Sequence, residues 1–230
     1  MEKITVKQLI KFRGKSERTK ITFVKNLERE KIKSADDSGG DYWISCLSAI
    51  RNAFKFDNVD LLDEKINLLK DKINLEDDGR IKDQFQRNLD IVNNFKDYDF
   101  KHLKPNVDLT FLAQPKDHAI LNIKGFPIEA KPCHIFTFSN NKSEEIGGIW
   151  FVAQLEGFKK SELGMFADMI YRYLNKYYSK DYYVNPDYCI AVDLFNGHEA
   201  NYAEIQNGTI PILIDSTLDD LKEFDKITIG

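Results

Sequence analysis

Apolar residues recur at every third or fourth position in the first half of the chain, which is the spacing of one face of an α-helix. Three stretches show it, with apolar positions at Ile44, Leu47, Ile50 and Phe54, at Leu62, Ile66, Leu69 and Ile73, and at Ile81, Phe85, Leu89 and Val92. An earlier short helix is expected from Thr5 to Gly14, because Thr5 and Gln8 form a capping box and glycine commonly ends helices. A second basic segment from Ser16 to Lys33 is expected to be a helix, with a strand at residues 21–24 as the alternative, and a polar hinge follows at residues 36–40.

The pattern changes after Lys104 and Pro105. Runs of β-branched and aromatic residues, separated by Pro, Gly, Asn and Asp, predict strands at residues 107–113, 119–124, 128–138, 148–155, 188–195, 201–205 and 210–214. One long helix is expected from Lys160 to Tyr177, and a short last helix is capped by Ser216 or Thr217. The predicted fold class is therefore α+β, with a helical part at residues 1–103 and a mixed β-sheet with one long packed helix at residues 104–230. These parts are either two domains or one continuous domain.

Composition favours a folded, soluble protein. The 230 residues are 42% hydrophobic and 12% aromatic, which is enough for a core and excludes a disordered chain. No apolar run is long enough to cross a bilayer, and the N-terminus does not resemble a secretory signal. Cys46, Cys133 and Cys189 are far apart and odd in number, as expected of reduced thiols. We therefore expect a cytoplasmic protein.

Charge is distributed unevenly along the chain. The net charge is −4, but Met1 to Lys33 contains eleven Lys or Arg against four Glu, and the stretch from Asp215 to Asp225 is acidic. Such asymmetry is typical of a nucleic-acid face, of a solvated charged helix, or of two complementary surfaces that meet within or between chains. The candidate nucleic-acid-binding residues are Lys7, Lys11, Arg13, Lys15, Arg18, Lys20 and Lys25.

One short motif points to catalysis. Asp108 lies in one predicted strand, and Glu129 and Lys131 alternate in a later one, so all three side chains could converge at one edge of a sheet. Two carboxylates there would bind Mg²⁺, and the lysine would stabilise phosphate charge. The motif resembles that of the PD-(D/E)XK nuclease superfamily. The resemblance implies that Asp108 and Glu129 bind the metal and that Lys131 assists hydrolysis.

The same residues have a plainer interpretation, in which Glu129 and Lys131 are an exposed cross-strand pair. Val107 stands where the family motif has proline, and Pro132 follows Lys131, although a central strand needs that backbone N–H. Nuclease-like folds also occur as non-catalytic variants. We therefore place a non-catalytic binding subunit that docks a protein or nucleic-acid partner ahead of the nuclease.

A second constellation lies where a predicted strand gives way to the long helix. It comprises Gln154, Glu156 and Lys159, with Gly157 beside them and with Gly147 and Gly148 at the start of the preceding strand. Side chains at such junctions often form binding sites, and these glycines allow tight turns or close approach of backbones. A purely structural role for this strand-to-helix turn is the alternative.

Overall fold

The computed structural model describes residues 3–28, 42–113, 119–140 and 143–229. The hinge predicted at residues 36–40 lies outside these ranges. Helix α1 (Val6–Arg13) begins at the predicted capping box, in which the Gln8 N–H donates to Thr5 Oγ1 at 3.2 Å and the Thr5 N–H donates to Gln8 Oε1 at 2.7 Å. Gly14 caps its C-terminus.

The other predicted helices of the first half are also confirmed. They are α2 (Glu17–Glu28), α3 (Ile44–Phe56), α4 (Asp60–Leu75) and α5 (Gly79–Asn94), followed by a 3₁₀ helix, η1 (Phe100–Leu103). Each of α3, α4 and α5 buries most of the apolar face that its sequence spacing defines, for example Leu47 and Ile50 in α3 and Leu62 in α4. Ile44 and Ile81, in the first turns of α3 and α5, are exposed instead.

The second half forms two sheets. The larger has the strand order β2 (Thr110–Leu112), β5 (His134–Asn140), β6 (Ser143–Val152), β7 (Tyr183–Asp193) and β8 (Glu199–Asn201). Within it β6 and β7 are parallel and are connected by the long helix α6 (Lys160–Tyr178), whereas the other neighbours are antiparallel. The smaller sheet has the order β1 (Ile4–Thr5), β4 (Phe126–Glu129) and β3 (Ile120–Ile123). The α+β fold is therefore confirmed.

Three of the predicted strands are wrong in detail. The run at 128–138 is divided between β4 and β5, which belong to different sheets, because Pro132 lies in the connection between them and has no N–H to donate. The predicted strand at 201–205 is helix α7 (Tyr202–Gln206), and the one at 210–214 is a turn that leads into α8 (Ile214–Ile229). Helix α8 is also longer than predicted, and Ser216 and Thr217 lie inside its first turn rather than capping it.

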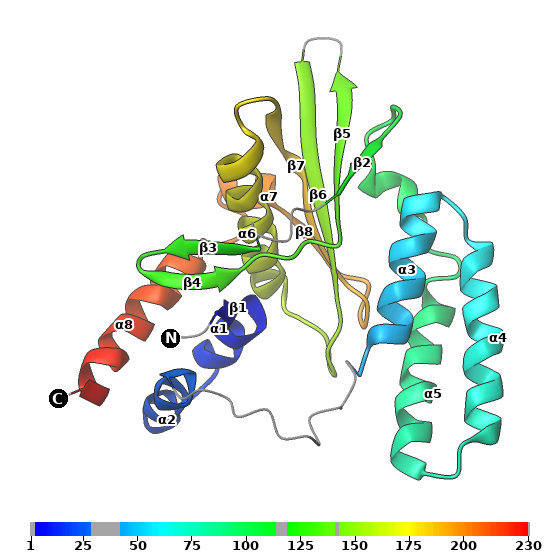
Figure 1. The fold of residues 1–230 in the computed structure, drawn as a ribbon, viewed down its shortest axis with the longest axis horizontal. Helices are drawn as coiled ribbons and strands as arrows, with labels where there is room; N and C mark the ends of the chain where they lie inside the picture. Colours follow the sequence, from blue (N-terminus) through cyan, green and yellow to red (C-terminus); the bar gives the residue numbers. More distant parts are fainter. Residues whose placement is uncertain (1–2, 29–41, 114–118, 141–142, 230) are drawn as a thin grey trace.

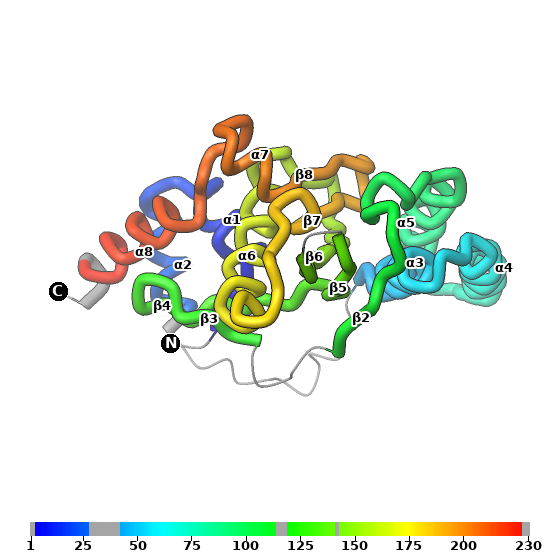
Figure 2. Tube along the Cα trace, turned by 90° about the horizontal axis from the view of Figure 1, so that it is seen from above, coloured from blue at the N-terminus to red at the C-terminus, as the bar shows by residue number. Residues whose placement is uncertain are grey.

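Helices cover both faces of the larger sheet (Figures 1 and 2). On one face α3, α4 and α5 share a core with side chains of β5, β6 and β7, among them Phe136, Ile149 and Val192. On the other face α6 packs together with α1, α8 and the small sheet around a second core that includes Phe166 and Ile170. The parallel strands β6 and β7 are consequently held at the centre, and their carboxyl ends reach one edge of the molecule.

No helix in the described ranges is long and apolar enough to cross a membrane. The three cysteines are free thiols, and Cys46 and Cys189 are buried.

One buried imidazole predicts sensitivity to acid. His134 stacks on Phe54 and donates to the Arg51 carbonyl oxygen at 3.0 Å, and its burial, with Lys55 and Arg51 nearby, lowers its pKa from 6.5 to about 4. Between these pH values the unfolded chain takes up a proton that the folded protein does not, so stability falls as the pH decreases across this window. We expect the free energy of unfolding to fall by on the order of 2 kcal/mol. Urea unfolding at pH 7 and pH 4.5 should show this loss, and His134→Gln should reduce it; an unchanged loss in that variant would exclude His134 as its source.

Candidate functional site

Two of the three residues of the motif that resembles a nuclease site, Glu129 and Lys131, are in contact. Glu129, at the end of β4, accepts from Lys131 Nζ at 2.7 Å and from Lys3 Nζ at 2.5 Å. Burial alone would raise the pKa of Glu129, but the two lysines outweigh it and hold that pKa below its ordinary value. The carboxylate is thus engaged by two cations in the small sheet.

Asp108 lies elsewhere, just before β2 of the larger sheet, where it lines a hollow of about 360 Å³ with Lys101 and Lys104. Among the described residues, no hydrogen bond or ion pair joins it to Glu129 or Lys131. Within those residues no group of three or more His, Cys, Asp or Glu side chains could hold a metal ion. The nuclease resemblance and its Mg²⁺ site therefore stay predictions.

The basic N-terminal residues are divided between internal contacts and solvent. Lys7 Nζ donates to the Ala153 carbonyl oxygen at 3.1 Å, and Arg13 donates to Thr217 Oγ1 at 3.0 Å. Lys20 lies 4.0 Å from Asp220 of α8 and over the rings of Phe12 and Phe224. The remaining candidates are exposed, and they are Lys11, Lys15, Arg18 and Lys25. The charge asymmetry of the sequence thus arises in part from basic helices that pack against an acidic one within the chain.

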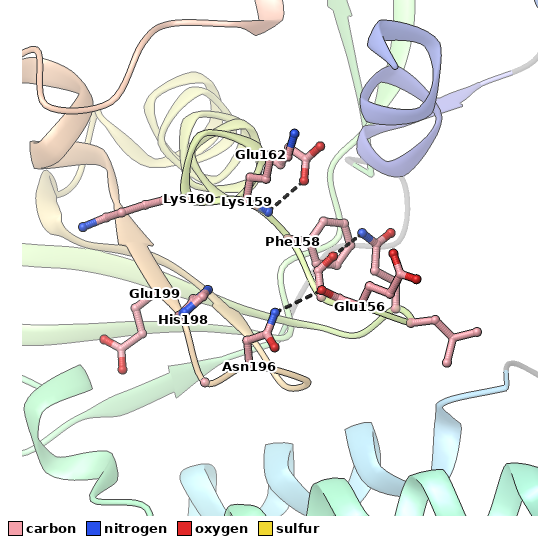
Figure 3. Close-up of a pocket in the computed structure, with 12 residues that line it drawn as sticks. Glu156, Phe158, Lys159, Lys160, Glu162, Asn196, His198 and Glu199 are labelled. Atoms are coloured by element: carbon pink, nitrogen blue, oxygen red, sulfur yellow. Dashed lines mark hydrogen bonds between the residues drawn. The ribbon is translucent and has the colours of Figure 1, made fainter. Parts of the chain in front are cut away.

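The second constellation lines a cavity at the junction of strand and helix. This open cleft of about 950 Å³ is at the carboxyl ends of β6 and β7. It is lined by the loop that leaves β6, by the first turn of α6 and by the turn between β7 and β8 (Figure 3). The lining residues are Gln154, Leu155, Glu156, Gly157, Phe158, Lys159, Lys160, Glu162, Asn196, Gly197, His198 and Glu199. The crevice beyond the carboxyl ends of parallel strands is where α/β sheets usually bind ligands.

Most charged groups of the cleft are already paired. Lys160 Nζ lies 2.5 Å from Glu204 Oε1, and Glu162 Oε2 accepts the Lys159 backbone N–H at 2.8 Å. Glu156 and Lys159 differ, because both are exposed and neither side chain forms an ion pair within the described part of the chain. Leu155 is 52% exposed, whereas Phe158 is buried. The cleft therefore presents apolar surface together with one free charge of each sign.

Glu199 connects the cleft to the helical layer. Its Oε1 atom accepts from the hydroxyl of Tyr98 and lies 2.7 Å from His102 Nε2, both in the segment after α5. Burial, followed by the hydrogen bond to Glu199, raises the pKa of Tyr98 far above its ordinary range. This triad ties β8 to the helices and fixes one end of the cleft.

The sequence identified part of this site. Gln154, Glu156 and Lys159 all line the cleft, and the turn at Asn196 and Gly197 between β7 and β8 forms its opposite side. Tyr98 and His102 were missed, because only folding brings them to Glu199 from about a hundred positions away.

The chain was compared with protein-family models, with curated proteins and with solved structures, and no match was found in any of the three comparisons.

Proposed function

We propose that this chain is a non-catalytic binding protein that holds a peptide segment of a protein partner in the cleft at the carboxyl ends of β6 and β7. The main support for this proposal is the cleft itself, which has a volume of about 950 Å³ and a lining of both apolar and charged residues. That size suits several side chains rather than a single ion. An apolar centre with charges at the rim is also the usual composition of a protein interface.

The engagement of the ionisable side chains supports binding rather than catalysis. Glu162, Lys160 and Glu199 each have a partner within the protein. These side chains therefore stabilise the loops around the cleft and are not free to act as an acid or a base. The internal contacts of Lys7, Arg13 and Lys20 favour a protein over a nucleic acid, because phosphate binding depends on free basic groups.

Selection from a random peptide library tests the proposal. Peptides enriched on the immobilised protein should bind with a dissociation constant on the order of 10 µM. Leu155→Glu should weaken that binding by at least about tenfold, because it places a charge on the apolar surface of the cleft. Binding can be measured by fluorescence anisotropy.

Leu75→Glu is the matched control. Leu75 is 84% exposed at the end of α4 and does not line the cleft, so this substitution should leave peptide affinity unchanged. Equal binding by wild type and Leu155→Glu would contradict the proposal. So would Mg²⁺-dependent cleavage of nucleic acid that is lost in Glu129→Ala and Lys131→Ala, since that result would establish the nuclease alternative.

A further inference from the structure

Asp193, the last residue of β7, connects the two loops that form the cleft. Its side chain has no exposed surface. Oδ2 accepts the backbone N–H of Phe158, in the loop before α6, at 3.0 Å. Oδ1 accepts the backbone N–H of Phe195, in the turn after β7, at 3.1 Å. One carboxylate thus fixes two segments that are almost forty residues apart in the chain.

Further hydrogen bonds join the same segments. The Asp193 backbone N–H donates to the His198 carbonyl oxygen at 2.8 Å, and its carbonyl oxygen accepts from the Gly197 N–H at 2.9 Å. Asn196 Nδ2 donates to the Glu156 carbonyl oxygen at 3.1 Å, which bridges the cleft floor (Figure 3). Both loops are consequently parts of one hydrogen-bonded unit.

Gly157 leaves the space that this arrangement needs. Its φ is +70°, and a Cβ atom there would lie 2.3 Å from Asp193 Oδ2 and 2.0 Å from Asn196 Nδ2. A larger residue would therefore displace both side chains, so the absence of a side chain at this position lets the carboxylate reach the Phe158 N–H.

Burial of the Asp193 carboxylate is energetically unfavourable. Burial raises the pKa of Asp193, and the backbone N–H groups of Phe158, Phe195 and Asn196 compensate only in part. No salt bridge among the described residues pairs Asp193 with Lys or Arg, so its charge is compensated by these N–H groups and by nearby His198. An apolar residue would leave the Phe158 and Phe195 N–H groups without their acceptor, so the carboxylate is what imposes the geometry of both loops.

We propose that Asp193 is the positioning residue of the cleft, which holds the Phe158 and Phe195 loops in their binding arrangement before a partner arrives. Preorganisation of this kind raises affinity by lowering the entropy lost on binding. What the cleft then holds rests on the proposed function, whereas the positioning role itself does not.

Asp193→Asn separates geometry from stability. Asparagine has nearly the same shape but only one acceptor oxygen, so it can accept from Phe158 or from Phe195 but not from both. Amide hydrogen exchange of at least one of these two residues should accelerate by about tenfold or more. Affinity for a selected peptide should fall by about tenfold. The urea midpoint should change little, because removal of the buried charge offsets the backbone N–H that loses its acceptor.

Asp78→Asn is the matched control. Asp78 Oδ1 also accepts two backbone N–H groups, from Arg80 at 2.8 Å and Ile81 at 3.4 Å, but it caps α5 outside the cleft. This substitution should change neither the exchange of Phe158 and Phe195 nor peptide affinity. Unchanged exchange at both residues in Asp193→Asn would overturn the positioning role. Faster exchange with unchanged peptide affinity would leave that role standing and count against the peptide-binding function.

The wild-type protein supplies a test that does not depend on whether the variant folds. The Phe158 and Phe195 amides should exchange at least about 100-fold more slowly than the exposed Leu155 and Glu156 amides of the same region. Similar rates at all four amides would overturn the proposal, because the carboxylate would then not be holding the two loops.

Discussion

Arg172→Ala is expected to lower the free energy of unfolding by about 3–5 kcal/mol, because it leaves a buried carboxylate without its cation. Asp168, one turn earlier on α6, is only 2% exposed and accepts from Arg172 Nε at 2.8 Å. Burial already raises the pKa of Asp168, although Arg172 opposes that shift. The same guanidinium binds Asp215 in the first turn of α8, so the substitution also removes a link between two helices. Urea denaturation followed by circular dichroism would measure the loss.

A matched exposed pair provides the comparison. Lys96 Nζ lies 2.7 Å from Asp63 Oδ1, but both side chains are about half exposed. Lys96→Ala should therefore lower the free energy of unfolding far less than Arg172→Ala does, because solvent screens an exposed ion pair. In the Arg172→Ala background, Asp168→Asn should restore part of the stability, because an amide replaces the unpaired charge. Equal losses in Arg172→Ala and Lys96→Ala would show that the buried pair has no special role.

Gly147→Ala should have the second large effect, with a loss of about 2–4 kcal/mol. A Cβ atom at Gly147 would lie 2.7 Å from both the Cβ and the carbonyl oxygen of Tyr188, and 3.0 Å from a ring carbon of Phe136. The contact falls at the register irregularity between β6 and β7, so the backbone of the central parallel pair would have to move. The change in the urea midpoint would report this strain.

Gly79→Ala is the corresponding control. Gly79 is the first residue of α5, and a Cβ atom there would meet nothing within 4 Å. Alanine should leave stability unchanged or raise it by up to about 1 kcal/mol, because it is the better helix former. Equal changes in stability in Gly147→Ala and Gly79→Ala would show that close packing around Gly147 does not exclude a side chain there.

The helices were predictable because their information is local. The spacing of Leu47, Ile50 and Phe54 defines a buried face, and Thr5 with Gln8 specifies where α1 begins. Asn201 and Glu204 form a capping box of the same kind at the start of α7, and this signal was present in the sequence but was interpreted as a strand.

Other errors arose because tertiary contacts decide the outcome. The apolar run from Ile210 to Ile214 has the composition of a strand, but Ile210 packs against Gly164 of α6, where a Cβ atom would lie 2.6 Å from its Cγ2 atom. A run of five residues does not reveal such a partner. The predicted strand at 128–138 is divided between β4 and β5, so Glu129 ends a strand of the smaller sheet, whereas Asp108 precedes β2 of the larger one.

The cleft shows the same division between local and distant information. Gln154, Glu156 and Lys159 follow directly from the strand-to-helix junction. Asp193 was part of a predicted buried strand, and nothing in its surroundings in the sequence indicates that its carboxylate accepts from Phe158. The contribution of residues far apart in the chain is what turns a short polar segment into a preformed cavity.

The most direct test of the central claim is to locate the bound peptide on the protein by NMR. A ¹⁵N-labelled sample would be titrated with a selected peptide, and the change of each backbone amide signal would be mapped onto the structure. We predict that the largest changes fall at residues 154–162 and 196–199, and that Leu155→Glu abolishes them at the same peptide concentration. Changes centred on the basic helices α1 and α2, or around Glu129 and Lys131, would contradict the cleft as the binding site.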